Sequence, residues 1–347
     1  MISRYERNPV VTKEQVKPSR PDFEVIGAFN AGVAVYGGET VLLLRVAERP
    51  IARQAAFVPC AVYSHDMGEI IVLEFPKDSK DIDTSDPRIV VTPGQSYLTS
   101  ISHFRLARSK DGLHFNVDDR PFLTAGNEYE AFGIEDPRIT PLDGRYYFTY
   151  SSASECGIVT SLASTADFRE VRREGVLFQP DNKDVVLFPG KIGGKFYALT
   201  RPSSSYYGKP DIWIAESENL LDWGGHKRIA AIRPGLWDSA RVGGGAVPFL
   251  TDRGWVEIYH GADAGNCYCL GILLLDRQEP WKVLARSSKP LIVPCEDYEM
   301  QGFFGNVMFS CGCTRDGDRI TVYYGSADES MSCFTLELAD VWANLKG

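Results

Sequence analysis

The sequence predicts an all-β fold, a five-bladed β-propeller with a central substrate pocket and a short C-terminal helix. The first observation is a recurring unit, in which a Tyr- or Phe-rich strand is followed by a strand that carries small residues. The second is its spacing of about 50–60 residues, which leaves room for several short strands in each unit. The third is the scarcity of amphipathic helix, which disfavours parallel α/β folds.

The recurring unit is clearest in four segments, residues 146–168, 196–223, 255–287 and 320–342. Residues 97–115 show the second strand of the unit in the same form. The anchor positions of this second strand are Ala107, Ala163, Ala215, Leu273 and Leu336. The first three anchors are 56 and 52 residues apart, and the last two follow after about 60 residues each. This regular phase predicts about five similar blades.

The end of the chain, LELADVWANLK, is the best candidate for a helix, and a short one. No linker rich in Pro, Gly or Ser divides the sequence, so we expect residues 1–347 to form a single propeller domain. A two-sheet sandwich is the alternative, although a sandwich of 347 residues would be unusually large.

Composition excludes several classes of function. A net charge of −9 and a pI near 5.2 argue against a nucleic-acid partner, because phosphate backbones need basic surface. No apolar run approaches the roughly 18 residues of a transmembrane helix, so we expect no membrane partner. Residues 1–25 lack the apolar segment of a signal peptide, and we expect a cytoplasmic protein. The oligomeric state stays open, a homo-oligomer included.

The eight cysteines predict neither disulfides nor a metal site. There is no Cys-x-x-Cys, and the pairs Cys267/Cys269 and Cys311/Cys313 lie in strand-like sequence, where residues i and i+2 share a face. Reduced, structural thiols agree with a cytosolic location. The acidic stretch 81–86 lacks the spacing of a calcium loop.

The stretch Gly133-Ile134-Glu135-Asp136-Pro137-Arg138 is the most informative for chemistry, and Ser85-Asp86-Pro87-Arg88 repeats part of it. The proline fixes its own φ and favours an extended residue before it, which would hold a carboxylate rigidly at a strand end. A single Asp-Pro more often marks a turn with a surface ion pair. In a chain of Tyr-rich strands it also suits a glycosidic bond, which is commonly broken by one positioned acid plus a nucleophile.

Residues at corresponding points of the repeat should gather around one pocket, because the first strands of propeller blades converge on a central channel. The Gly243-Gly244-Gly245 run indicates a close backbone approach at the channel wall rather than a nucleotide-binding loop. The polar residues at those points suit a sugar and an anion: Asn30, Arg45, Ser102, His103, Glu135, Asp136, Arg201, His260 and Asp328.

Long blocks of the chain resemble glycoside hydrolase family 130, which comprises β-mannoside phosphorylases and some β-mannosidases on a five-bladed propeller. The blocks are residues 29–49, 103–115, 133–140, 182–202, 211–226, 241–248, 254–263, 284–294 and 322–328. The resemblance runs from about residue 5 to 340. Residues 232–248 and 298–312 look most like the β-1,2-mannobiose and β-1,2-mannooligosaccharide phosphorylases.

The resemblance implies roles for individual residues. Asp136 matches the proton donor, which in the family's mannosyl-glucose phosphorylases is thought to act through the mannose 3-hydroxyl. Glu135 would point another way in an extended segment and hold a sugar hydroxyl or Arg138. The positions expected to contact the sugar are Asn30, Arg45, Arg88, His103, Glu135 and Asp328. The positions expected to line the phosphate site are Asn182, Lys183, Arg201, Arg241, His260 and Tyr268. No metal or cofactor is implied beyond phosphate as co-substrate.

Phosphate as the nucleophile explains a cationic pocket in place of a second acid. An inverting hydrolase needs a carboxylate base about 6.5–9.5 Å from the acid, whereas phosphate is already an anionic nucleophile. We therefore expect reversible, inverting phosphorolysis of a mannooligosaccharide to α-mannose 1-phosphate. Asp181 and Thr200 stand where many phosphorylases of the family have arginine and histidine, which leaves a β-mannosidase as the alternative. A non-catalytic glycan-binding propeller is the third hypothesis.

Overall fold

Strands make up most of the regular structure in the computed structural model, which describes residues 2–203 and 207–346. The prediction of an all-β chain is confirmed. The helices are short: α1 (Asp297–Met300), α2 (Leu338–Asn344) and the 3-10 segments η1 (Lys13–Gln15) and η2 (Glu128–Glu130). Helix α2 lies in the C-terminal segment that was expected to be helical. No helix among the described residues has both the length and the apolar character needed to cross a bilayer.

Three antiparallel sheets follow the chain in order. The first contains β10 (Ile134–Leu142), β11 (Arg145–Ser154), β12 (Gly157–Thr165) and β13 (Arg172–Phe178). The second contains β14 (Asn182–Leu187), β15 (Phe196–Pro202), β16 (Ile212–Ser217) and β17 (Trp223–Ala230). The third contains β18 (Arg241–Gly243), β20 (Gly254–Ala262), β21 (Tyr268–Leu275) and β22 (Val283–Arg286), with β19 (Phe249–Thr251) on β20.

The two ends of the chain share an eight-stranded sheet. One half contains β2 (Phe23–Tyr36), β3 (Glu39–Pro50), β8 (Ile101–Ser109) and β9 (Asn116–Val117). The other contains β23 (Met308–Asp316), β24 (Arg319–Ser326), β25 (Ser330–Glu337) and β1 (Ser3–Arg4). Strands β2 and β23 join the halves through a parallel pairing of Gly32 with Cys311. The N-terminal strand β1 thus completes a run that begins near the C-terminus.

The repeat predicted from the anchor positions is confirmed at the level of strands. The five anchors lie on β8, β12, β16, β21 and β25, each the third strand of its four-strand run. The runs pack on one another through apolar and aromatic side chains. One such layer joins β3 and β8 to β10–β12 and contains Leu43, Phe104, Phe148 and Tyr150, all buried. Burial of one such side chain contributes roughly 1.5–3 kcal/mol, so these layers hold the sheets firmly.

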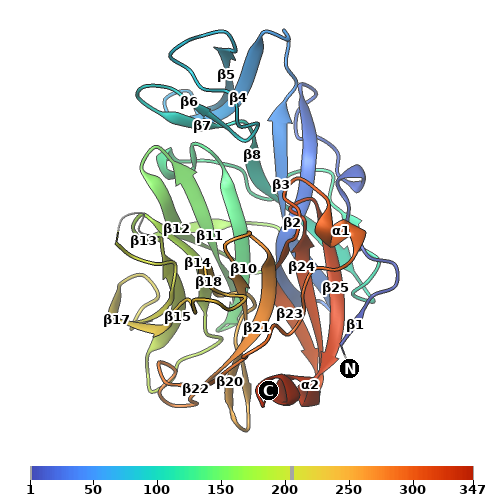
Figure 1. Cartoon of the computed structure of the whole chain (residues 1–347), viewed down its shortest axis with the longest axis vertical. Coiled ribbons are helices and arrows are strands. Elements are labelled where there is room, and N and C mark those ends of the chain that lie inside the picture. Colours follow the sequence, from blue (N-terminus) through green and yellow to red (C-terminus); the bar gives the residue numbers. More distant parts are fainter. Residues whose placement is uncertain (1, 204–206, 347) are drawn as a thin grey trace.

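A long insertion separates β3 from β8. It contains the hairpin β4 (Phe57–Ser64) and β5 (Glu69–Pro76), followed by β6 (Ile89–Val91) and β7 (Ser96–Leu98). Figure 1 shows these four strands together at one end of the molecule, away from α2 at the opposite end. Part of the insertion, Arg88, reaches the cavity described below.

The first strands of three runs are interrupted at the same place. Each has a register shift against its neighbour, between Phe29 and Gly32, between Glu135 and Arg138, and between Lys183 and Val186. A residue with left-handed φ lies inside each shift: Asn30 at 47°, Asp136 at 52° and Asp184 at 53°. Asn and Asp tolerate this conformation better than most side chains do. These bulges turn polar side chains out of the strand pattern.

Candidate active site

The bulged strands border a cavity of about 360 Å³. The residues that line it come from every four-strand run and from the insertion: Asn30, Arg45, Arg88, Glu135, Asp136, Lys183, Asp184, Arg201, Arg241, Tyr268, Phe304, Val307, Phe309 and Asp328. Ten of these had been predicted as site residues. The cavity therefore gathers residues up to about 300 positions apart in the sequence, as a closed arrangement of sheets allows.

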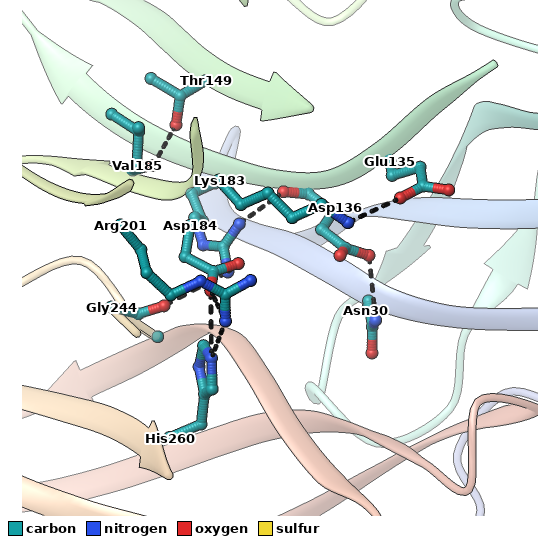
Figure 2. Close-up of polar contacts among 12 residues, drawn as sticks. Asn30, Glu135, Asp136, Thr149, Lys183, Asp184, Val185, Arg201, Gly244 and His260 are labelled. Carbon is teal, nitrogen blue, oxygen red and sulfur yellow. Dashed lines mark hydrogen bonds and ion pairs between the residues drawn. The ribbon is translucent and has the colours of Figure 1, made fainter. Parts of the chain in front are cut away.

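Carboxylates gather at one end of the cavity. Asp136 is buried, and its Oδ1 accepts hydrogen bonds from Asn30 Nδ2 at 2.9 Å and from Arg45 Nη1 at 3.0 Å. Arg45 Nη2 donates to Glu135 Oε1 at 2.8 Å, so one guanidinium bridges two adjacent carboxylates. Its Nε donates to Ser102 Oγ at 3.1 Å. Figure 2 shows the contact of Asp136 with Asn30. Charge-assisted contacts of this kind hold the acid end rigidly.

The extended conformation predicted before Pro137 is wrong. Asp136 has a left-handed φ of 52°, and the register shift around it adds a residue to β10. In a regular strand neighbouring side chains point to opposite faces, whereas the bulge brings Glu135 and Asp136 into the same cavity. Glu135 also pairs with Arg45 rather than with Arg138, and its Oε2 lies 3.7 Å from Lys183 Nζ.

The carboxyl groups at this end differ in their pKa values. Burial alone would raise the pKa of Asp136, but Arg45, Arg138 and Lys183 outweigh it and the pKa is lowered. The pKa of Asp328 is raised to about 7, first by burial and then by the charges of Asp136 and Glu135. Neighbouring acids with separated pKa values are typical of catalytic sites.

Two cations, Arg201 and Arg241, gather around Tyr268 at the anion end of the cavity, whereas Lys183 lies beside Glu135 at the acid end. Lys183, Arg201 and Arg241 line the cavity together with Tyr268. Arg241 Nη1 donates to the Tyr268 hydroxyl at 2.7 Å and Nη2 to Asn266 Oδ1 at 3.1 Å. Two arginines beside a phenol, with Lys183 in the same cavity, make a suitable environment for an oxyanion such as phosphate.

Asp184 is a site residue that the sequence analysis missed. It is 2% exposed and lines the cavity between three basic side chains (Figure 2). Its Oδ1 lies 3.0 Å from Arg138 Nη2, and its Oδ2 lies 2.7 Å from Arg201 Nη1 and 3.1 Å from His260 Nε2. The detectable signal was its position: Asp184 holds in β14 the bulge position that Asn30 holds in β2 and Asp136 in β10. Phe304, Val307 and Phe309 were missed because apolar lining carries no chemical motif.

Two residues predicted for the site lie elsewhere. His103 pairs with Val46, next to the pair of Arg45 with Phe104, and therefore lies on the opposite sheet face from Arg45. Its buried ring lies 3.6 Å from Glu48 and 3.2 Å from Arg105, so Ser102 takes its expected place. Asn182 accepts a hydrogen bond from the Arg201 backbone and faces a second cavity of about 650 Å³.

His260 lies behind the cavity wall rather than in it. It is fully buried, contacts Asp184 and Arg201, and stacks on Phe309 with ring centroids 4.3 Å apart. Burial lowers the pKa of the His260 imidazole more than Asp184 raises it. Its contact with an anion site is therefore indirect.

Asp181 and Thr200, the two departures from the family pattern, both line the second cavity. Asp181 Oδ1 accepts a hydrogen bond from the Ile158 backbone at 2.9 Å. The Asp181 carboxylate is therefore not placed beside Asp136 as a water-activating partner. Among the described residues, no group of three or more His, Cys, Asp and Glu side chains could hold a metal ion.

Comparison with known proteins agrees with this geometry. The family model described as beta-1,4-mannooligosaccharide phosphorylase, glycoside hydrolase family 130, matches residues 87–346. The beta-1,2-mannobiose phosphorylase of Listeria innocua is 47% identical over 99% of this chain and 98% of its own. Its structure in complex with beta-1,2-mannobiose has a TM-score of 0.96 and covers 99% of both chains. A 1,2-beta-oligomannan phosphorylase of Thermoanaerobacter sp. is 38% identical over 86% of this chain and 96% of its own.

Proposed function

Because the chain belongs to glycoside hydrolase family 130, we propose that it catalyses the reversible, inverting phosphorolysis of β-mannosides to α-D-mannose 1-phosphate. β-1,2-Mannobiose is the substrate that we put first, because two relatives that cover most of the chain are named for β-1,2-linked mannosides. The observation that carries the proposal is the shared cavity, which holds Asp136 and Lys183 at the acid end and Arg201 and Arg241 at the anion end.

In this proposal the acid end of the cavity binds the sugar and the anion end binds phosphate. The mannosyl unit binds against Asn30, Arg45, Glu135 and Asp328, which offer both donors and acceptors to its hydroxyl groups. Phosphate binds against the cations and attacks the anomeric carbon from the face opposite the leaving sugar. The new bond joins the anomeric carbon to a phosphate oxygen, the glycosidic bond breaks, and Asp136 supplies the proton that the departing oxygen needs. A single attack on the opposite face inverts the anomeric centre.

Phosphate binding also prepares the acid. In the empty cavity, cations hold the pKa of Asp136 low, so its carboxyl group is ionised near neutral pH. A phosphate dianion offsets the charges of Lys183 and the arginines, and the pKa of Asp136 rises as a result. Asp328, with a pKa of about 7, is a neighbouring carboxyl group that still carries a proton in part at neutral pH.

The cavity is poorly built for water activation. Glu135 is paired with Arg45, Asp184 with Arg138 and Arg201, and Asp328 lies among the charges of the acid end. An inverting hydrolase needs an available base across from the acid. The mannosidase alternative is therefore disfavoured. A glycan-binding module, for its part, has no need of a buried acid that faces a group of cations.

The test is incubation with β-1,2-mannobiose in the presence and absence of inorganic phosphate, with ³¹P NMR to detect α-mannose 1-phosphate. We expect phosphate-dependent cleavage, and sulfate as a control should not replace phosphate. Arg201→Ala should raise the KM for phosphate by about 10–100-fold, the value of a charge-assisted hydrogen bond, and the KM for mannobiose far less. Release of free mannose at full rate without phosphate would instead favour the mannosidase.

We also propose that the five four-strand runs are the blades of a propeller around this cavity. Supporting this, the anchors occupy the third strand of every run, and β1 completes the last run as an outer strand. A single domain over residues 1–347 and a cytoplasmic location stay predictions.

A further inference from the structure

Asp184 is a carboxylate in the wall of a site that we assign to an anion. Its side chain is 2% exposed, and both of its oxygens face basic groups: Oδ1 faces Arg138 at 3.0 Å, and Oδ2 faces Arg201 at 2.7 Å and His260 at 3.1 Å. Arg138 and Arg201 together carry two positive charges within contact of a single negative one. A negative charge at this place repels phosphate, so its presence needs a reason other than phosphate affinity.

A glycine in the neighbouring strand allows Asp184 and His260 to lie this close together. Gly243 lies against them, and a Cβ atom added there would overlap Asp184 Oδ2 and come within 2.6 Å of the His260 ring. Arg138 extends the network, since its Nη1 donates to the Asp136 carbonyl at 3.0 Å and its Nη2 to the Gly244 carbonyl at 3.2 Å. Asp184 therefore connects the anion end of the cavity to the backbone of the acid.

A buried charge without a partner of opposite charge strongly destabilises the folded state. Removing one partner of a buried ion pair therefore destabilises the fold through the charge that remains. When phosphate is absent, Asp184 supplies the compensation for Arg138 and Arg201. When phosphate is present, the two anions compete for Arg201, which lines the cavity. Arg201 can take part in this competition because it lines the cavity and meets Asp184 and His260 through its Nη1.

We propose that Asp184 is the internal counter-ion of the phosphate site: it keeps Arg138, Arg201 and His260 in place while the site is empty, and it weakens the binding of phosphate and mannose 1-phosphate so that both can leave. The proposal rests on the proposed function in taking phosphate as the anion. It assigns Asp184 a role opposite in sign to that of the arginines. A residue that only oriented Arg201 would strengthen phosphate binding, whereas a counter-ion weakens it.

The test compares the full-length protein with Asp184→Asn, which keeps the shape and removes the charge. We expect a lower melting temperature in phosphate-free buffer and a larger rise on addition of inorganic phosphate than wild type shows, because ligand that binds the folded state stabilises it. In the phosphorolysis assay, the KM for phosphate should fall by about threefold or more, since a repelling charge is gone, while the KM for mannobiose changes little.

Asp238→Asn is the matched control. Asp238 is fully buried and paired with two arginines, Arg233 at 2.7 Å and Arg286 at 2.5 Å, but it does not line the cavity. Asp238→Asn should have a lower melting temperature than wild type, but phosphate should raise it no more than it raises that of wild type. Should Asp184→Asn not fold, Asp184→Asn/Arg201→Met restores the charge balance and should be recovered folded.

A raised KM for phosphate in Asp184→Asn, or a phosphate-induced rise in melting temperature no larger than that of wild type, would overturn the proposal. Failure of the double variant to fold would do the same. If wild type itself shows neither phosphate-dependent cleavage nor stabilisation by phosphate, both the counter-ion and the proposed function are wrong. If only the variant behaves otherwise than expected, the proposed function stands and the counter-ion does not.

Discussion

At the scale of single residues, the site uses conformations that few side chains accept. Asn30, Asp136, Asp184 and Asp328 all have left-handed φ values between 47° and 53°. Such a residue costs about 1–3 kcal/mol, and the network of Arg45 and Arg138 around Asp136 is what offsets it. The strain is useful because it aims four polar side chains into one cavity, three from strands that would otherwise alternate between faces and Asp328 from the turn between β24 and β25.

Asp136→Asn tests the proton donor. Asn accepts the left-handed conformation and keeps the size of the side chain, so the fold should persist, but the transferable proton is lost. We expect kcat on β-1,2-mannobiose to fall by about 10²–10⁴-fold, measured beside a circular dichroism spectrum that matches wild type. An aryl mannoside, whose leaving group needs little protonation, should lose much less. Near-normal turnover of mannobiose would exclude Asp136 and make Glu135 the next residue to test.

Asp328 predicts a dependence of stability on pH. Its folded pKa, about 7, lies above its ordinary value, so the folded state holds a proton that the unfolded state releases. This contribution to stability is complete below pH 4 and is lost as pH rises to about 7, by at most about 4 kcal/mol. Asn does not titrate, so Asp328→Asn shows no such loss of stability. The melting temperature of the variant minus that of wild type should therefore be larger at pH 8 than at pH 5. An equal difference at both pH values would contradict the raised pKa.

At the scale of strands, the sequence predicted well which segments form equivalent strands, but it predicted poorly where their side chains point. Repeat phase identified the third strand of every run and six of the fourteen residues that line the cavity. The family resemblance added four more, Arg88, Lys183, Arg241 and Tyr268. A register shift leaves no mark in composition, so the bulges were not foreseen, and Asp136 was given the extended backbone that a following proline favours. Asp184 was overlooked although it follows Lys183 as Asp136 follows Glu135. The choice of His103 was wrong for a different reason: in the regular strand β8 only one of two neighbouring side chains faces Arg45, and that one is Ser102.

Gly243→Ala tests the close approach of the strands at the anion end. The added methyl group would overlap Asp184 and His260, so the loss of stability should be about 1–3 kcal/mol, as in overpacked cores. The KM for phosphate should also change, because both displaced groups contact Arg201. Gly94→Ala is the control, since its φ is not in the left-handed region and no atom lies within 4 Å of the added Cβ. Equal free energies of unfolding for the two variants in urea would show that Asp184 and His260 can move aside without loss of stability.

At the scale of the whole molecule, acid and anion sites belong to different sheets. Asn30, Arg45 and Asp136 come from β2, β3 and β10, whereas Arg201 and Arg241 come from β15 and β18. The packing between sheets therefore sets the distance between the two substrates. The net charge of −9 says nothing of this arrangement, because five of the 37 Lys and Arg residues are enough to line the cavity.

Reversal of the reaction tests the whole arrangement at once. Phosphorolysis conserves much of the energy of the glycosidic bond in the sugar phosphate, so the protein should also build β-mannosides from α-mannose 1-phosphate and mannose, releasing inorganic phosphate. Since attack occurs on the face opposite the leaving group in both directions, only the α-anomer of mannose 1-phosphate should serve as donor. Product analysis by NMR would identify both the linkage and the anomeric configuration. Acceptance of the β-anomer, or the absence of any synthesis from the α-anomer, would show that sugar and phosphate do not lie on opposite faces of the anomeric carbon.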